Sequence, residues 1–316
     1  MKPISKLFKT ALFGLISIAV LLSVFFGYPD KSLDELKSKY AQDPSKFIVI
    51  DDMNVHYRDE GNSLDSLPIV LIHGTSSSLH TFDAWTSSLK NKKRVVRMDL
   101  PGFGLTGPFI NQQYSIDNYV DFINHFLSAK GIKKCILGGN SLGGEIAWNF
   151  AVKNPNMVDK LILIDAAGYP LESKSIPIAF KIARIPVLNK LMTYITPRFL
   201  VQKSVENVYF DKIKINKTLV DRYFELTLRK GNRQALIDRM TFFSTTSSIQ
   251  KIKNIQQPTL IIWGEQDLLI PINSAYRFQS DLPNGTLVIL KKSGHVPMEE
   301  SPQKSLAPVL SFLKIK

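Results

Sequence analysis

The sequence has a single cysteine among its 316 residues, and this scarcity excludes two kinds of construction. Cys135 has no second cysteine to pair with, so an intrachain disulfide is impossible, and a metal site built on thiolates is not expected. Cys135 also falls in an apolar run, where a lone cysteine normally acts as a small buried hydrophobic residue. We therefore interpret it as part of a core.

Charged residues are also scarce. They make up 21% of the chain, whereas hydrophobic residues make up 44%. This composition excludes a disordered protein, and the length suffices for one large α/β domain or for a core with an insertion. The chain contains no internal repeat and no low-complexity tract, so a repeat architecture is not expected either.

Acidic residues are too few to balance the basic ones, which leaves a formal net charge of +13. The excess is concentrated in residues 171–256, where sixteen Lys or Arg face six Asp or Glu, a net of +10. No nucleic-acid motif accompanies it, and the aromatic residues there recur at helical spacings typical of packing. We expect no nucleic-acid partner. A solvated helical face is the simplest interpretation, with anionic headgroups or an acidic substrate as the alternative.

Residues 11–28 contain no charged side chain and follow Lys2, Lys6 and Lys9. A helix of this length spans about 27 Å, close to the thickness of a hydrocarbon core. A cleaved signal peptide is the alternative, but its apolar region is usually shorter and ends in a small-residue cleavage site, which is not evident here. We therefore predict a basic N-terminus at 1–10 and a single-pass membrane anchor at 11–28. The favoured location is a bacterial inner membrane with the domain on its outer side.

After a linker at 29–46, short apolar runs alternate with amphipathic stretches. Strands are expected within Phe47–Tyr57, which forms an antiparallel edge, and in later runs such as Ile69–Ile72 and Leu161–Ile164. This alternation is typical of a mostly parallel sheet covered by helices on both faces. The predicted fold class is therefore α/β.

The alternation stops near Pro170 and resumes at Thr259, and the residues between them have helical periodicity interrupted by prolines. We predict an α/β core made of residues 47–170 and 257–316, with an inserted helical cap at 171–256. Aromatic residues of the cap are candidates to line a substrate pocket: Phe180, Tyr194, Phe199, Tyr209 and Phe210.

Residues 138–144 read Gly-Gly-Asn-Ser-Leu-Gly-Gly, after the apolar run 135–137 and before a helical stretch expected at Glu145–Asn154. This is the pattern of a nucleophile elbow, in which a strained turn between strand and helix exposes the central hydroxyl and small neighbours avoid clashes. The pentapeptide alone is a weak signal, because small residues also form ordinary turns. With its flanking elements, it makes Ser141 the candidate nucleophile.

A serine hydroxyl needs a base that removes its proton, and histidine titrates near neutral pH without special tuning. His295 follows the last expected strand, and Asp267 follows the strand at 259–262. A carboxylate at that place would hold the imidazole in one tautomer and stabilise the imidazolium. Asp165 and Glu265 are the rivals for this role, although Asp165 is better explained as an acceptor that stabilises its loop.

The turn His73-Gly74-Thr75 follows another buried strand. There the backbone amide of Thr75, together with that of Leu142, would form an oxyanion hole. The alternative is an ordinary polar turn. Catalytic groups of such sheets lie on loops beyond the carboxyl ends of the strands, and all of these candidates satisfy that rule.

Taken together, these motifs resemble those of the α/β-hydrolase family across residues 47–314. The resemblance rests on the elbow and on four short segments: His73-Gly74, Asp99–Gly104, Trp263–Asp267 and Gly294–Pro297. The chain looks most like cap-bearing bacterial lipases and esterases and membrane-anchored monoacylglycerol lipases. This resemblance implies a serine carboxylester hydrolase that needs no metal or organic cofactor. The predicted membrane anchor suggests a small, lipid-derived ester as its substrate.

The elbow is also similar to that of the meta-cleavage product hydrolases, which split carbon–carbon bonds. Val296 departs from that subgroup, in which tryptophan typically follows the histidine. Haloalkane dehalogenases and epoxide hydrolases share the fold but carry aspartate at the position of Ser141, and are therefore disfavoured. A non-catalytic ligand-binding protein is the third alternative, and the sequence leaves the oligomeric state open.

Overall fold

The computed structural model describes residues 8–10, 13–14, 17, 21, 24–170, 172–186, 188–242 and 249–315. The basic N-terminus predicted at 1–10 and the anchor predicted at 11–28 lie largely outside these ranges. Across the described ranges, no helix combines the length and apolar character that crossing a membrane requires.

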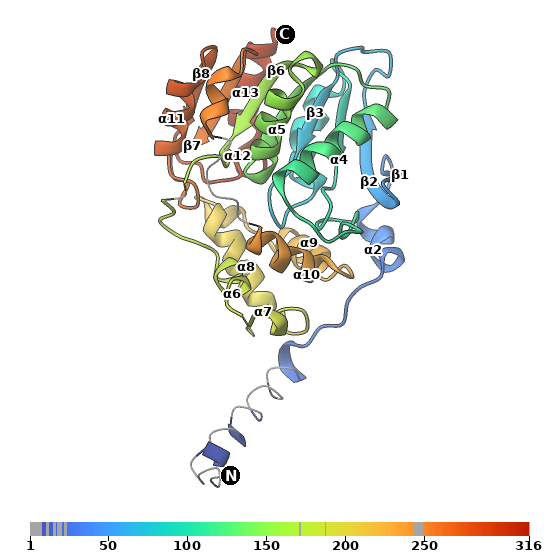
Figure 1. Cartoon of the computed structure of the whole chain (residues 1–316), viewed down its shortest axis with the longest axis vertical. Coiled ribbons are helices and arrows are strands. Elements are labelled where there is room, and N and C mark those ends of the chain that lie inside the picture. The colour runs from blue at the N-terminus through green and yellow to red at the C-terminus, as the bar shows by residue number, and fades with distance from the viewer. Residues whose placement is uncertain are drawn as a thin grey trace.

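Eight strands form one sheet in the order β1-β2-β4-β3-β5-β6-β7-β8 (Figure 1). The strands are β1 Lys46–Ile50, β2 Met53–Glu60, β3 Ile69–Ile72, β4 Val95–Met98, β5 Cys135–Asn140, β6 Val158–Ile164, β7 Thr259–Gly264 and β8 Gly285–Leu290. Only β2 pairs in antiparallel fashion, with β1 on one side and β4 on the other, while the remaining pairs are parallel. The predicted, mostly parallel sheet is confirmed, and so is its antiparallel edge.

The central strands are apolar along their whole length because helices bury both faces of the sheet. Val70 and Leu137 point to a core shared with α4 (Ile116–Ala129), α5 (Leu142–Lys153) and α11 (Asn273–Asp281). Their neighbours Leu71 and Ile136 point to the opposite core. That second core is closed by α3 (Asp83–Leu89) and α13 (Pro302–Leu313), and α12 (Pro297–Glu300) leads into α13.

Between β6 and β7 the chain leaves the sheet and forms a group of helices below the strand ends, as Figure 1 shows. We call this group, α6 to α10, the insertion. Its helices are α6 Ile178–Ala183, α7 Leu188–Leu191, α8 Arg198–Val208, α9 Lys217–Thr227 and α10 Asn232–Thr241. It lies on the side of the sheet where the strands end.

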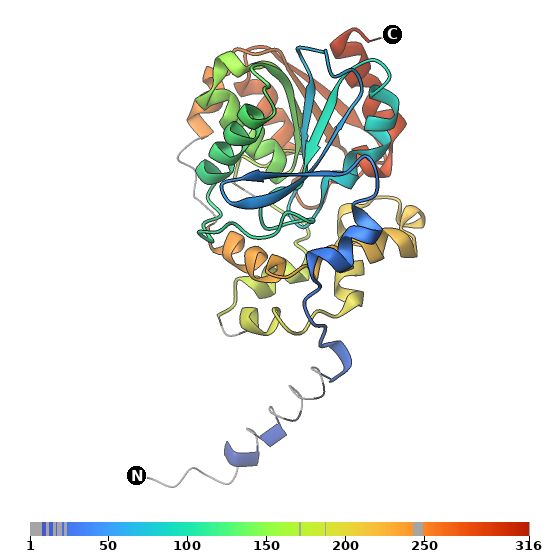
Figure 2. The same cartoon turned by 90° about the vertical axis from the view of Figure 1, so that its right-hand side faces the viewer.

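Residues 29–46, expected as a linker, pack against the insertion. Helix α2 (Leu33–Tyr40) begins with a capping box at Ser32, and its Leu36 is buried. The hydroxyl of Tyr40 donates to Glu225 of α9 at 2.8 Å, and Lys39 pairs with the same carboxylate. Figure 2 shows α2 beside the helices of the insertion. The segment therefore fixes the path of the chain that precedes the core.

The reactivity of the Cys135 thiol can be used to test how the sheet is packed. Its side chain is buried at the start of β5, and burial raises the pKa of its thiol to about 12. Because the thiolate is the reactive form, the native protein at about pH 8 should react with a chromogenic disulfide reagent orders of magnitude more slowly than the denatured protein. Equal rates in buffer and in guanidinium would contradict this placement of β5.

Candidate active site

Ser141 lies between β5 and α5 in a conformation that few non-glycine residues adopt. Its φ is 55° and its ψ is −118°. The turn is held by its backbone, because the amide of Ser141 donates to the Ile164 carbonyl at 3.1 Å and its carbonyl accepts from Ala167 at 3.0 Å. Strain of this kind persists only where surrounding bonds impose it, and it is common at functional sites. The predicted elbow geometry is present.

The glycines of the elbow are required by close approach of backbones. A Cβ on Gly139 would lie 2.1 Å from the carbonyl oxygen of Gly143. A Cβ on Gly143 would lie 2.2 Å from the carbonyl oxygen of Ile72 in β3. Both distances are far inside van der Waals contact with backbone atoms that cannot move aside. Glycine at both positions therefore lets helix α5 start immediately after Ser141. This start lies three residues before the one that the sequence pattern suggested.

His295 and Asp267 are in direct contact. His295 Nδ1 lies 2.6 Å from Asp267 Oδ2, and both side chains are buried. The other oxygen of Asp267 accepts the backbone amides of Leu269 at 2.8 Å and Ile270 at 3.0 Å, which fixes the carboxylate. His295 Nε2 is buried and has no hydrogen-bond partner among the described residues. The imidazole is thus oriented from one side and left available on the other.

Asp165, the rival acid, lies next to this pair but does not replace Asp267. One oxygen or nitrogen from each of Asp165, Asp267 and His295 lies within 4.8 Å of the other two. Asp165 Oδ1 accepts the amide of Gly264 at 2.8 Å. Burial and then the negative charge of Asp267 raise the pKa of the Asp165 carboxyl well above its usual value. Burial beside Asp267 therefore favours the neutral form of the Asp165 carboxyl.

The same three side chains are the residues that could in principle hold a metal ion in the described part of the chain. However, Nδ1 of His295 and Oδ2 of Asp267 point at each other, so an ion would have to displace their hydrogen bond. The donor set thus fits a proton relay better than a coordination site. That no metal or organic cofactor is needed stays a prediction.

The loop after β3 brings Thr75 into the lining of the cavity that Ser141 also lines. His73 supports the loop: its Nδ1 donates to the Gly74 carbonyl at 2.8 Å, and its Nε2 accepts the Leu100 amide at 2.9 Å. Burial lowers the pKa of His73, in keeping with this neutral tautomer. Leu142 is the first residue of α5, where helix amides have no intrahelical partner.

Two contacts that the sequence did not reveal tie the elbow and the insertion to the histidine loop. Asn140 Nδ2 donates to the His295 carbonyl at 2.9 Å and to the Ile164 carbonyl at 3.1 Å. Glu300 accepts the amide of Gly294 and the amide of Asp211, both at 2.7 Å. Asn140 stands at a variable position of the elbow motif, and nothing around Glu300 distinguishes it in sequence, so neither gave a signal.

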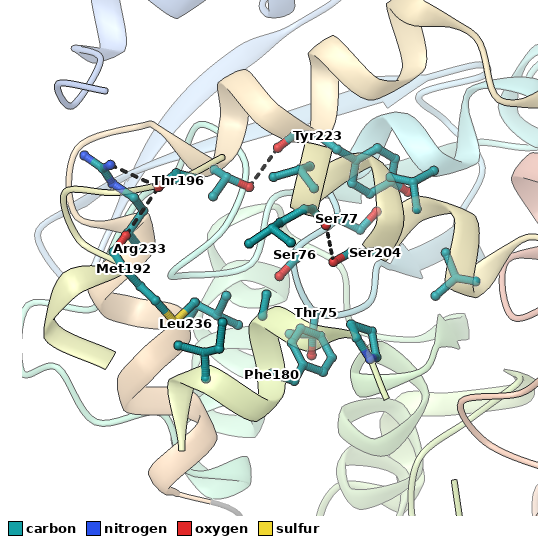
Figure 3. A pocket seen from close by; sticks show the side chains of 18 of the residues that line it. Thr75, Ser76, Ser77, Phe180, Met192, Thr196, Ser204, Tyr223, Arg233 and Leu236 are labelled. Carbon is teal, nitrogen blue, oxygen red and sulfur yellow. Dashed lines mark hydrogen bonds between the residues drawn. The ribbon is translucent and has the colours of Figure 1, made fainter. Parts of the chain in front are cut away.

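A cavity of about 440 Å³ extends from Ser141 and His295 into the insertion. In Figure 3, Ser76 and Ser77 belong to the core side of this cavity, while Phe180 and Met192 belong to the insertion. Most other lining residues are aliphatic or aromatic. Arg233 is the one Lys, Arg, Asp or Glu residue among the described lining residues.

Of the five aromatic residues expected at the pocket, Phe180 and Phe199 line it, and the other three are not among its described lining residues. Tyr194 is 72% exposed and Phe210 is 44% exposed. Tyr209 is buried in the core formed by α3 and α13, because α8 ends at Val208 and the chain turns toward the histidine loop. Helical spacing gave the residue type but not the direction of each side chain.

This arrangement of sheet, elbow and acid–histidine pair identifies the class. The chain belongs to the alpha/beta hydrolase fold family, whose sequence pattern matches residues 68–302. The resemblance to the α/β-hydrolase family, inferred from the motifs, is therefore confirmed.

Relatives within the family differ in what they are named for. The chain is 27% identical over 281 residues to the uncharacterized hydrolase YugF of Bacillus subtilis, covering 87% of this chain and 99% of that one. It is 26% identical over 276 residues to 2-hydroxy-6-oxononadienedioate/2-hydroxy-6-oxononatrienedioate hydrolase 2 of Pseudomonas putida, covering 83% and 92%. A putative lipase (lip1) from Acinetobacter baumannii superposes with a TM-score of 0.74 at 26% identity, covering 90% and 95%. The chain therefore belongs to a family of hydrolases, but these relatives do not show which type of bond it cleaves.

The neutral state of Asp165 can be tested by stability. A carboxyl whose pKa is raised by folding stabilises the native state fully below its usual pKa, and this contribution is lost as the pH rises. Asp165→Asn keeps an acceptor for Gly264 and cannot ionise. The free energy of unfolding of the variant, relative to the original protein, should therefore increase from about pH 4 to about pH 8 in urea titrations.

Asp159 provides the matched control at the other end of β6. A hydrogen bond from Lys134 lowers the pKa of Asp159, so its contribution is present above the usual pKa and is lost on acidification. Asp159→Asn should therefore show the opposite trend with pH. Parallel curves for Asp165→Asn and the original protein would mean that Asp165 is not held neutral.

Proposed function

We propose that this protein is a serine carboxylester hydrolase that forms an acyl-enzyme on Ser141. The observation that carries the proposal is the shared cavity: Ser141 lines it at the elbow, and His295, oriented by Asp267, lines it with an unpartnered Nε2. A hydroxyl, a base and an orienting carboxylate are the parts that nucleophilic acyl transfer requires.

In the proposed reaction, His295 Nε2 takes the Ser141 proton as Oγ attacks the ester carbonyl. Asp267 stabilises the imidazolium through Nδ1, and the amides of Thr75 and Leu142 donate to the oxyanion. His295 then gives the proton to the leaving alcohol, and the acyl group stays on Ser141. Water activated by His295 hydrolyses this acyl-enzyme, which releases the acid and restores the hydroxyl.

The apolar lining of the cavity supports an acyl chain as the bound group. Burial of hydrocarbon would supply the binding energy, and Thr75, Asn140 and His295 offer polar atoms at the end where the ester would sit. We propose a small lipid-derived ester, with acylglycerols as the favoured class. In this proposal residues 171–256 act as a cap that selects substrate over the core made of 47–170 and 257–316.

We also propose that the protein is anchored in a membrane. The charge-free run at 11–28 supports a single-pass anchor in a bacterial inner membrane with the domain on its outer side. Its last residues, Phe26 to Tyr28, bond to the insertion and would lie outside the bilayer. The full chain should then sediment with membranes and resist carbonate extraction, whereas a chain that begins at Val24 should be released. Release of the full chain by carbonate would contradict the anchor.

A second candidate is hydrolysis of a carbon–carbon bond in a dienoic ketoacid. Two observations favour it: the named relative from Pseudomonas putida, and the guanidinium of Arg233 in the cavity, which an anionic substrate would attract. The carboxylate of Asp30 already pairs with Arg233 at 2.7 Å, which argues for the ester. Comparing the turnover of nitrophenyl or glycerol esters with the turnover of a ring-fission product decides between ester hydrolysis and carbon–carbon bond hydrolysis.

Removal of the nucleophile or the base should nearly abolish turnover. Ser141→Ala and His295→Ala are expected to lower kcat by about 10⁴-fold or more, and Ser141→Ala should also end labelling by a fluorophosphonate probe. Asp267→Asn should cost somewhat less, because the hydroxyl of Ser141 and the imidazole of His295 both remain. The measurements are steady-state kinetics on a medium-chain ester and gel fluorescence of the labelled chain.

Glu265→Gln is the control for the acid, because Glu265 is exposed in the same loop and has the same charge. It should keep the original kcat. Full activity in Asp267→Asn would transfer the role to Asp165, and absence of both labelling and ester turnover in the original chain would refute the ester hydrolase.

A further inference from the structure

The substrate cavity is bounded in part by a segment that precedes the α/β core. We propose that Phe26–Lys31, which we call the N-terminal strap, is a wall of this cavity and sets the length of acyl chain that it accepts. The proposal rests on the ester hydrolase function proposed above and adds a specificity element to it. It is carried by the contacts of the strap with the insertion and by the place of Phe26 among the lining residues.

Phe26 lines the same cavity as Ser141 and His295. Its ring meets the ring of Phe199 edge to face, with centroids 5.8 Å apart, and Phe199 lines the cavity as well. The Phe26 carbonyl accepts the amide of Thr196 at 3.0 Å. Phe26 is therefore built into the lining.

Backbone bonds fix the strap at both ends. Gly27 forms a β-bridge with Ile195, and the Tyr28 amide donates to the Tyr194 carbonyl at 3.1 Å. At the other end, the Lys31 amide donates to Leu228 at 2.7 Å and its carbonyl accepts from Lys230 at 2.9 Å. A segment held in this way loses its conformational freedom and can act as a wall.

The strap also supplies the counter-charge of the cavity. The side chain of Arg233 is 5% exposed, and it pairs with Asp30 at 2.7 Å and donates to Thr196 at 3.1 Å. Without Asp30, a cation would be left buried beside hydrocarbon, which is strongly unfavourable. The ion pair therefore joins the strap to α10 and keeps this end of the cavity suited to an apolar group.

The position of the strap determines what it can select. Ser141 stands at the strand ends, whereas the strap meets the insertion at the α7–α8 connection, on the side away from the sheet (Figure 1). An acyl chain attached to Ser141 and lying in the cavity would run toward Phe26. The ring of Phe26 would then limit the number of methylene groups that fit.

Substitution of Phe26 in the full chain tests the wall. Phe26→Ala should shift the optimum of kcat/KM to esters longer by two or more carbons. Each methylene that newly finds apolar contact should gain about fourfold in kcat/KM. Phe26→Trp should shift the optimum to shorter esters, and turnover of a nitrophenyl acetate, which does not reach the wall, should stay within about twofold in both variants.

Phe25→Ala is the matched control, because Phe25 is the adjacent aromatic residue, is 69% exposed and is not among the described lining residues. Its chain-length profile should equal that of the original protein. Asp30→Asn should raise KM for long esters and leave the acetate unchanged. Identical profiles for Phe26→Ala and Phe25→Ala, or an equal loss on acetate and long esters, would overturn the proposal.

A binding measurement that does not depend on catalysis tests the wall separately from the proposed function. In the Ser141→Ala background, binding of fluorescent fatty acids of graded length should show the same shift with Phe26→Ala. If the original chain hydrolyses no ester but the binding shift appears, the proposed function fails and the wall stands. If esters are hydrolysed and neither kinetics nor binding changes, the wall fails and the function stands.

Discussion

The approach of α5 to the sheet at the elbow is the constraint on which the rest of the site depends. Because Gly139 and Gly143 let the backbones meet, the helix starts directly behind Ser141 and the turn takes its left-handed φ. The strained turn is held by bonds to neighbouring strand ends, and Asn140 carries the same restraint to His295. Ser141 and His295 are thereby set by one network of bonds, although they are 154 residues apart.

The electrostatics of the site follow from burial. Two buried carboxyl groups and an imidazole lie within 4.8 Å of one another. Two negative charges so close together in a buried position repel each other strongly. Asp267 accepts two backbone amides and pairs with the imidazole, whereas Asp165 accepts one amide, and burial and the charge of Asp267 raise the pKa of the Asp165 carboxyl. The two positions therefore differ in role because their hydrogen bonds differ.

The sheet, its antiparallel edge and the order of Ser141, Asp267 and His295 could be predicted, since apolar runs and short motifs act locally. The start of α5 was misplaced because close backbone contact with β3 overrides local patterning. Tyr209 was misassigned as a pocket residue because side-chain direction depends on where α8 ends. The strap, Asn140 and Glu300 join residues far apart in sequence, and a single sequence carries no record of such pairs.

Glu300 limits how the insertion could be exchanged between hydrolases of this fold. The carboxylate of Glu300 accepts the amide of Gly294, next to His295, and the amide of Asp211 in the insertion. The His295 amide also donates to the Val208 carbonyl at 2.8 Å. The insertion and the loop that carries His295 thus share bonds across the chain. A chimera that takes its insertion from another hydrolase would have to take the partner loop as well, because the recombination unit here spans two distant stretches of sequence.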